Sequence, residues 1–161
     1  MKTLILCTAI PASGKSTWSR IYQNEHENVF IVSSDEIRKE LTGVYTNLNF
    51  EKETWEIYFK RINTLRDANK DCVLIADSTN ILNKFRKQCG SIEGFDEKEL
   101  VVIKKDLDLC LKKNRERGAA KFVPEFAIKR MYEQWEEVDE ETAKLFTKIT
   151  HIDGWFDKEK I

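Results

Sequence analysis

The chain has 161 residues, of which 41% are hydrophobic and 34% charged. This composition is typical of a globular domain and excludes disordered, collagen-like and coiled-coil proteins. With 27 basic and 28 acidic residues the formal net charge is -1, which excludes a globally basic protein that coats nucleic acid. The length suits one domain, so we expect residues 1–161 to form a single unit.

The cysteines and the N-terminal segment indicate a reducing compartment. The four cysteines lie far apart, and no CxxC or Cys/His pair has the spacing of a zinc site: Cys7, Cys72, Cys89 and Cys110. We interpret them as reduced thiols. The apolar run at the N-terminus is too short to span a membrane and lacks a small-residue cleavage site. We therefore expect a cytoplasmic protein with no membrane partner.

Five apolar runs, each ending near turn or capping residues, predict the strands of a parallel sheet: 3–8, 29–32, 72–76, 100–103 and 149–152. Segments with helical spacing of apolar residues separate these runs. The clearest is 50–70, where an aromatic stripe steps by three and four residues and is expected to pack in the core. The alternation predicts an α/β fold with helices on both faces of the sheet.

Near the C-terminus, Pro124 can begin one more helix. Apolar residues then step by three and four along one predicted face: Ile128, Met131, Trp135, Val138, Thr142 and Leu145. Its other face is acidic between 133 and 141, which predicts a solvated surface. A small basic group is likewise expected on the surface: Lys84, Arg86 and Lys87.

The segment from Ala9 to Thr17 follows the first strand and precedes a helix, and its sequence AIPASGKST fits a phosphate-binding loop. Ala9 stands where the first glycine usually is, and it requires a negative φ there. In such loops backbone N–H groups and the helix N-terminus bind phosphate oxygens. Lys15 can reach the β- and γ-phosphates, and the Ser16 hydroxyl suits Mg²⁺. We expect ATP to bind here, at Ala12, Ser13, Gly14, Lys15, Ser16 and Thr17.

Two acids and an arginine follow other strands. Asp77 ends the third strand, from which it can hold Mg²⁺ together with Ser16; the alternative is a residue that caps the turn. Asp35 ends the second strand, and Arg38 lies three residues later on the same helix face. This pair suits phosphoryl transfer to an alcohol, with Asp35 accepting the hydroxyl proton and Arg38 holding an anionic group of the acceptor. The alternative is a helix cap with a local ion pair.

Residues 104–130 contain nine basic and four acidic side chains, within a chain that is nearly neutral. Small residues follow Arg115 and Arg117, as a mobile lid over ATP requires, so we predict a lid at about 115–123. Both arginines are expected to bind ATP, and Arg117 also to neutralise charge on the transferring phosphoryl group. The alternative is a solvated basic helix end.

Four segments in order resemble the kinase domain of phage-type polynucleotide kinases and related P-loop kinases: AIPASGKSTW, VSSDEIRKEL, LIADSTN and NRERGAAKFVPEFAIKRMY. The resemblance covers nearly the whole chain. It implies a five-stranded, adenylate-kinase-like parallel sheet with a small lid. It also implies ATP and Mg²⁺ at Lys15 and Ser16, Asp35 as general base, Arg38 on the acceptor phosphate, Asp77 as a supporting carboxylate and Arg117 as the lid arginine.

The function implied is transfer of the γ-phosphate of ATP to the 5'-hydroxyl of single-stranded or end-exposed DNA or RNA. Enzymes of this kind often carry a 3'-phosphatase domain, but residues 1–161 contain no DxDGT motif, so none is expected here. Two alternatives stay open. One is a kinase of a small hydroxyl compound such as a nucleoside, sugar or antibiotic, and the other is a regulatory module that binds ATP without transferring phosphate.

Overall fold

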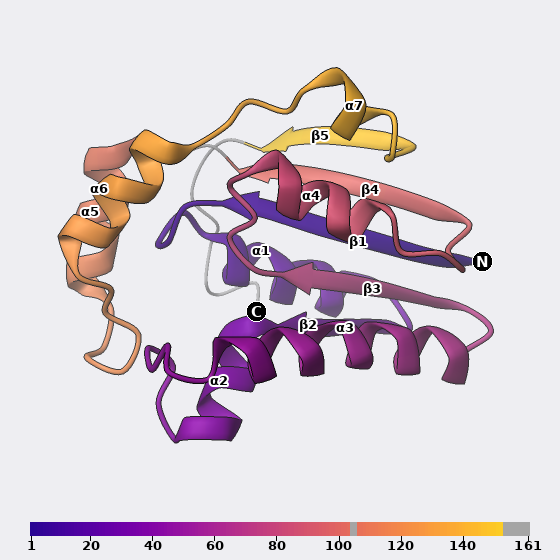
Figure 1. The fold of residues 1–161 in the computed structure, drawn as a ribbon, viewed down its shortest axis with the longest axis horizontal. Coiled ribbons are helices and arrows are strands. Elements are labelled where there is room, and N and C mark those ends of the chain that lie inside the picture. Colours follow the sequence, from indigo (N-terminus) through magenta and orange to yellow (C-terminus); the bar gives the residue numbers. More distant parts are fainter. Residues whose placement is uncertain (104–105, 153–161) are drawn as a thin grey trace.

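The computed structural model describes residues 1–103 and 106–152, which form a five-stranded parallel sheet between helices (Figure 1). The strands are β1 (Lys2–Ala9), β2 (Val29–Ser33), β3 (Cys72–Asp77), β4 (Glu97–Ile103) and β5 (Lys148–Ile152). The helices are α1 (Lys15–Glu25), α2 (Ser34–Thr42), α3 (Glu51–Ala68), α4 (Asn83–Gly90), α5 (Leu107–Glu116), α6 (Glu125–Gln134) and α7 (Glu140–Ala143). The α/β class and the five predicted strands are confirmed.

The strand order, β2-β3-β1-β4-β5, places β1 at the centre of the sheet with every neighbouring pair parallel. The chain leaves β1 toward β2 on one side, and it leaves β3 toward β4 on the other. In open parallel sheets ligands bind beyond the carboxyl ends of strands at such a reversal. Ser33 and Asp77 are register partners at the ends of β2 and β3, so the residues after β1, β2 and β3 share this edge.

Alternating residues of β1 build two cores. Leu4 and Leu6 face a cluster formed with α2, α3 and α4, which includes Tyr58. Ile5 and Cys7 face the opposite cluster, against which Trp18 of α1 packs. All these β1 residues are fully buried, which explains the continuous apolar run of a parallel strand. The two cores hold β1 rigidly beneath the loop that follows it.

The single helix predicted after Pro124 is wrong. Helix α6 ends at Gln134, an irregular segment follows, and α7 begins only at Glu140. The reason lies on α4, because the Glu136 carbonyl accepts a hydrogen bond from Arg86 Nη1 (2.7 Å) and the Glu137 carbonyl accepts one from Asn83 Nδ2 (2.9 Å). Backbone groups that a helix would pair internally are thus used by another element.

The expectation that Arg86 lies on the surface is also wrong, since its side chain is fully buried. Its Nε donates to the Asn80 carbonyl (2.9 Å), its Nη2 to Thr8 Oγ1 (3.1 Å) and its Nη1 to Asn83 Oδ1 (2.9 Å). Its guanidinium also lies 5.0 Å from the ring centroid of Trp135. Burial lowers the pKa of Arg86, although nearby Glu136 opposes this effect. Arg86 therefore ties α4 to the end of β1, to the loop after β3 and to the segment after α6.

The acidic stretch after α6 is only partly solvated. Glu136 Oε1 accepts the backbone N–H of Asn83 (2.8 Å), Asp139 caps α7, and Glu141 pairs with Lys87 (2.9 Å). The four cysteines are free and buried, as predicted for reduced thiols. Within residues 1–103 and 106–152, no helix combines the length and the apolar character needed to cross a bilayer.

Candidate functional site

The loop between β1 and α1 has the backbone that a phosphate site requires. Ala12 and Gly14 both adopt positive φ, 64° and 97°, and Gly14 caps the N-terminus of α1. Ala9 is the last residue of β1 and is not among the residues of positive φ, so a glycine is not required there. The turn directs the loop toward the carboxyl edge of the sheet, where a helix N-terminus favours anions.

Lys15 and Asp77 form a buried ion pair between the first turn of α1 and the end of β3. Their side chains are 11% and 4% exposed. Ser16 Oγ lies 3.3 Å from the other carboxylate oxygen, Oδ2, of Asp77. Burial opposes the charge on Lys15, but the carboxylates of Asp77 and Asp35 outweigh it and raise the pKa of the ammonium. Asp77 thus lies beside Ser16, as expected, whereas its ion pair with Lys15 was not predicted.

The residues of the loop fit a triphosphate and Mg²⁺. The Ser13 side chain is 1% exposed, and its Oγ has no hydrogen-bond partner among the residues that the structure describes, which leaves a donor for a phosphate oxygen. Ser16 and Asp77 supply the hard oxygens that suit Mg²⁺, which normally takes its other ligands from water and phosphates. No group of three or more His, Cys, Asp or Glu side chains suited to a metal occurs within the described ranges. The predicted ATP contacts of this loop stay predictions at all six positions: Ala12, Ser13, Gly14, Lys15, Ser16 and Thr17.

Asp35 and Arg38 meet on α2, as their spacing predicts. Arg38 Nη1 donates to Asp35 Oδ1 at 2.6 Å, and the Asp35 carboxylate remains 57% exposed. Ser33 caps the helix by accepting the Glu36 N–H (3.3 Å), so the cap role considered for Asp35 falls to Ser33. Asp35 thus presents a carboxylate to solvent from the helix that follows β2. Ser33, two residues before Asp35, is the register partner of Asp77, so Asp35 follows β2 at the edge of the sheet that carries the phosphate loop.

Glu51, at the start of α3, was not predicted as part of the site. Its two carboxylate oxygens accept hydrogen bonds from Arg38 Nε (2.9 Å) and Nη2 (2.7 Å). The guanidinium lies 5.8 Å from the ring centroid of Trp55, one turn further along α3, and the Arg38 side chain is only 11% exposed. Burial disfavours the charged form, but Glu51 and Asp35 raise the pKa of Arg38.

The two predicted lid arginines differ in their surroundings. Arg117, the C-cap residue just after α5, is half-buried and donates to the Lys121 carbonyl (2.9 Å). Desolvation lowers the pKa of Arg117, while the charge of Asp35 acts in the opposite direction. Arg115 is exposed and pairs with Glu125 (2.7 Å). The ATP contacts of both arginines, and closure of the lid, stay predictions.

The segment Asp77-Ser78-Thr79-Asn80 fixes the phosphate loop to β3, a role that the sequence analysis missed. The Ala9 N–H donates to the Thr79 carbonyl (2.8 Å), and Thr8 Oγ1 donates to the Asn80 carbonyl (2.6 Å). Asn80, itself at a positive φ of 46°, donates from Nδ2 to the Cys7 carbonyl (3.0 Å). These bonds hold Asp77 and the start of the loop in one geometry.

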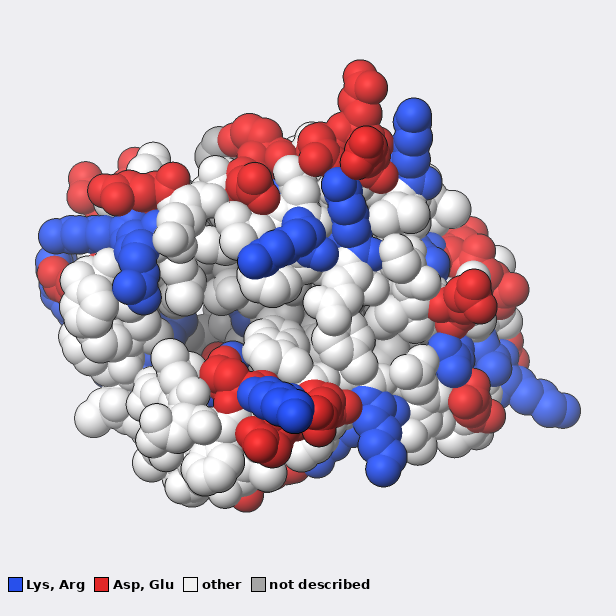
Figure 2. Space-filling view, in the orientation of Figure 1, with Lys and Arg blue, Asp and Glu red and all other residues white. Residues whose placement is uncertain are grey.

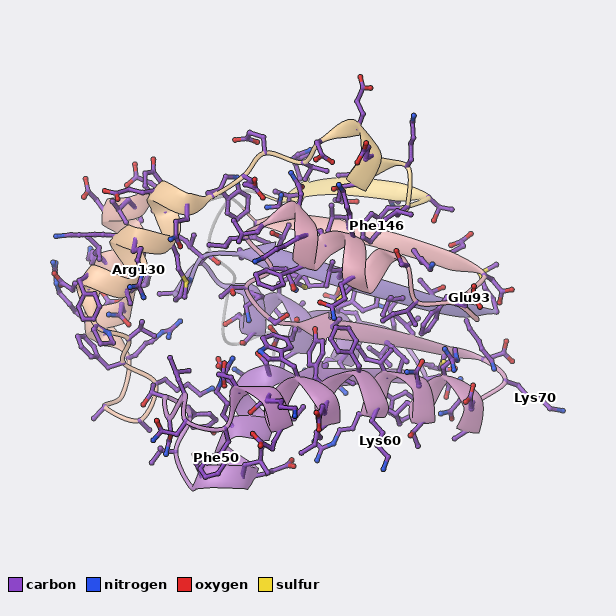
Figure 3. All side chains as sticks on the ribbon, viewed as in Figure 1. Phe50, Lys60, Lys70, Glu93, Arg130 and Phe146 are labelled. Carbon is purple, nitrogen blue, oxygen red and sulfur yellow. The ribbon has the colours of Figure 1, made fainter. Side chains whose placement is uncertain are left out.

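Figure 2 shows the surface hollowed between the α5–α6 side and the α2–α3 side of the molecule. Figure 3 labels Arg130 on α6 and Phe50 before α3, on the two sides of this hollow. Lys121 Nζ lies 5.1 Å from the ring centroid of Tyr45, and Lys39 Nζ lies 4.7 Å from the same centroid. The segment after α5 therefore contacts the loop between α2 and α3.

Comparison with known proteins agrees with this geometry. A family model described as an AAA domain matches residues 4–138. The chain belongs to this family of P-loop kinases. Over 143 residues this AAA-domain chain is 32% identical to L-seryl-tRNA(Sec) kinase of Methanococcus maripaludis, a match that covers 83% of this chain and 52% of the relative.

Solved structures share the fold of this AAA domain. A chain of the Pnkp1/Rnl/Hen1 RNA repair complex superposes with a TM-score of 0.71 at 20% identity, covering 90% of this chain and 46% of the other. Kti12 of Chaetomium thermophilum, solved with ADP-AlF3, superposes with a TM-score of 0.64 at 14% identity, covering 98% and 92%. The AAA domain described here thus spans about half the length of the first two proteins that it matches.

Proposed function

We propose that this protein is an ATP-dependent kinase that transfers the γ-phosphate of ATP to the 5'-hydroxyl of DNA or RNA. The observation that carries the proposal is the Asp35–Arg38 pair. An exposed carboxylate and a cation lie together on α2, which begins at the end of β2, the strand whose last residue is the register partner of Asp77. A site with a phosphate loop on one side and such a pair on the other suits phosphoryl transfer to an alcohol.

In the proposed reaction the acceptor oxygen attacks the γ-phosphorus of ATP while its proton passes to the carboxylate of Asp35. The bond from the γ-phosphorus to the β–γ bridging oxygen breaks, and ADP leaves with that electron pair. Lys15 binds the β- and γ-phosphates, and Arg117 neutralises the charge on the transferring group. When bound, Mg²⁺ supplies charge neutralisation at the phosphate oxygens, and Ser16 and Asp77 are the residues that would hold it.

The nucleic-acid acceptor is supported by Arg38. Its guanidinium is one helical turn from Asp35, so it suits the anionic group nearest to a 5'-hydroxyl, the phosphate on the 3' oxygen of the same nucleotide. The similarity in fold to a chain of an RNA repair complex is consistent with this acceptor. A free sugar carries no such phosphate, and for it Arg38 would have no anionic partner in the acceptor.

A second candidate acceptor is the serine hydroxyl of a seryl-tRNA. The 32% identity over 143 residues to L-seryl-tRNA(Sec) kinase favours it, because that enzyme, by its name, phosphorylates a group attached to RNA. The same phosphate loop and the same base would serve both acceptors, since both present a primary hydroxyl.

The deciding experiment offers radiolabelled ATP with Mg²⁺ and four acceptors: a 5'-hydroxyl oligonucleotide, a seryl-tRNA, a nucleoside and a sugar. We expect label on the oligonucleotide. In the Asp35→Asn variant turnover should fall by roughly 10²- to 10⁴-fold, while the affinity for ATP changes little, because the lost group acts on the acceptor. Label on the seryl-tRNA alone would select the second candidate. ATP binding without label on any acceptor would indicate a regulatory module.

Lys15→Ala provides the matched test of the phosphate loop. We expect calorimetry to show weaker binding of ATP and Mg²⁺, because Lys15 is the cation that this loop presents to the β- and γ-phosphates. A variant that binds ATP as tightly as the wild type and keeps its turnover would place the nucleotide elsewhere.

A further inference from the structure

A pocket of about 250 Å³ opens between α3 and α4, beside the site already described. Its walls come from α3, α4 and the loop after Asp77: Trp55, Phe59, Asn80, Phe85, Gln88 and Cys89. The phosphate loop contributes no residue to this lining. The pocket is therefore separate from the expected ATP site, although the two share the loop that follows β3.

Trp55 connects the pocket to the acceptor side of the site. This residue lines the pocket, and its ring also lies 5.8 Å from the guanidinium carbon of Arg38. Glu51, which binds Arg38, precedes Trp55 by one turn of α3. Trp55 is therefore shared between the pocket and the surroundings of Arg38, so a group bound to Arg38 lies near one wall of the pocket.

The lining favours a flat, uncharged, aromatic occupant. Three of the six lining residues are aromatic, and none is charged at neutral pH, because burial raises the pKa of the Cys89 thiol to about 12. Phe85 is 42% exposed, and Lys84 Nζ lies 4.9 Å from the centroid of its ring. Aromatic side chains bind nucleobases by stacking, whichever base is present. Walls that are mainly aromatic offer few partners for the several hydroxyl groups of a sugar ring.

The pocket also has one amide able to recognise an edge of the occupant. The amide nitrogen of Asn80 is already used, since Nδ2 donates to the Cys7 carbonyl (3.0 Å) and to Ser78 Oγ (2.6 Å). Gln88 is exposed, and its amide makes no hydrogen bond to any residue within the described ranges. An amide offers both a donor and an acceptor, as the edges of nucleobases do.

We propose that this pocket binds the base of the acceptor's 5'-terminal nucleoside. The proposal rests on the proposed function and names a second determinant of its substrate. Arg38 holds the phosphate, Asp35 faces the 5'-hydroxyl, and the base enters between Trp55 and Phe85. The kinase thereby distinguishes a nucleoside acceptor from other phosphorylated alcohols.

The test compares two 5'-hydroxyl oligonucleotides of one sequence. The second carries an abasic tetrahydrofuran residue at its 5' end, which keeps the hydroxyl and the phosphate but lacks the base. Stacking and edge contacts predict that the wild type prefers the complete oligonucleotide by roughly 5- to 150-fold in kcat/KM. If the two oligonucleotides were used equally, base binding in the pocket would be overturned, but the proposed 5'-hydroxyl kinase activity would stand. No phosphorylation of either would overturn both.

Substitutions in the pocket test whether the preference for the complete oligonucleotide arises there. Phe85→Ala should lower kcat/KM for the complete oligonucleotide several-fold and leave the abasic one unchanged, whereas Phe85→Tyr, which keeps the ring, should retain the preference. Phe126→Ala is the matched control, because Phe126 on α6 is 68% exposed and lies outside the pocket. Thermal melts check that each variant folds. An equal loss on both oligonucleotides in Phe85→Ala would contradict base binding.

Discussion

Glu51 binds the guanidinium of Arg38 through two parallel hydrogen bonds, Nε to Oε2 at 2.9 Å and Nη2 to Oε1 at 2.7 Å. These bonds join the first turn of α3 to the middle of α2, across the loop that borders the hollow. Asp35 accepts a third hydrogen bond from the same guanidinium, donated by Nη1. The planar fork of an arginine suits this arrangement, and a lysine would not reproduce it. The cation expected to hold the acceptor is therefore already oriented.

Arg38→Ala should remove the preference for a phosphorylated acceptor. A charge-assisted hydrogen bond contributes about 1.5 to 3 kcal/mol, so its loss should cost roughly 10- to 150-fold in kcat/KM for a nucleoside 3'-monophosphate. The bare nucleoside lacks the phosphate and should be used almost equally by both proteins. A double-mutant-style cycle measures kcat/KM for the nucleoside 3'-monophosphate and the bare nucleoside, each with the wild type and with Arg38→Ala. Equal use of both acceptors by the wild type would exclude Arg38 from acceptor binding.

Glu51→Gln should raise KM for the phosphorylated acceptor by about tenfold and leave KM for ATP unchanged, because Glu51 acts only through the orientation of Arg38. Glu53→Gln is the control, since Glu53 is exposed on the same helix. Steady-state kinetics with each substrate varied in turn separates the two KM values. A lower acceptor KM in Glu51→Gln would show instead that Glu51 competes with the acceptor phosphate.

Asp77→Asn should destabilise the protein when no nucleotide is bound. The substitution removes the buried carboxylate that pairs with the Lys15 ammonium, whose side chain is only 11% exposed. Breaking such a buried pair costs about 3 to 5 kcal/mol of stability. Urea unfolding measures this change. Added tripolyphosphate should recover part of the loss, because its oxygens replace the carboxylate. Asp71→Asn, at an exposed position just before the same strand, should change little. A stable Asp77→Asn protein would contradict this account.

The parts of the site that follow strands were predictable from sequence, because each depends on a local pattern. Lys15, Asp77 and Asp35 each lie just beyond or at the carboxyl end of a buried apolar run, and parallel topology gathers such positions at one edge. Glu51 and Arg86 were not predictable in this way. Their partners lie 13 and 78 residues away, at Arg38 and Thr8, and no periodic pattern encodes these distances.

The segment after α6 shows how such a distant partner overrides a local signal. Apolar spacing continues past Trp135 and would support a helix. The carbonyls of Glu136 and Glu137 are instead bound by side chains of α4, so the segment leaves the helical path.

Core packing, which the sequence predicted for the whole aromatic stripe of α3, holds for only part of it. Tyr58 is fully buried as expected, whereas Trp55, three residues earlier, is partly exposed and lines the pocket.

Arg86→Ala should lower the free energy of unfolding by about 3 kcal/mol, because four oxygens to which Arg86 now donates, on Thr8, Asn80, Asn83 and Glu136, lose a buried donor. Arg86→Lys should recover only a fraction of this, since one ammonium cannot reach every partner of a planar fork. Lys84→Ala, exposed on the same helix, is the control. Urea midpoints that match for Arg86→Ala and Lys84→Ala would show that Arg86 does not hold these elements together.

Stability should fall above pH 9 because two of the four buried thiols, Cys7 and Cys89 on opposite faces of the sheet, have a strongly raised pKa in the folded state. Burial raises the pKa of Cys7 and of Cys89 from 9.0 to about 12, and the charge of Asp77 adds to the effect on Cys7. Below pH 9 both thiols are protonated in the folded and the unfolded states, so they cause no pH dependence. Above it, the unfolded state loses protons that the folded state keeps, which favours unfolding until about pH 12.

At pH 10 each thiol should therefore have removed about 1.4 kcal/mol from the free energy of unfolding relative to its value well below pH 9. Urea unfolding of the wild type, Cys7→Ala and Cys89→Ala between pH 7 and 10 measures this. Each variant starts from a lower stability because it creates a cavity, but its decline with pH should be shallower than that of the wild type. Parallel declines in all three proteins would mean that the two thiols ionise equally in the folded and unfolded states.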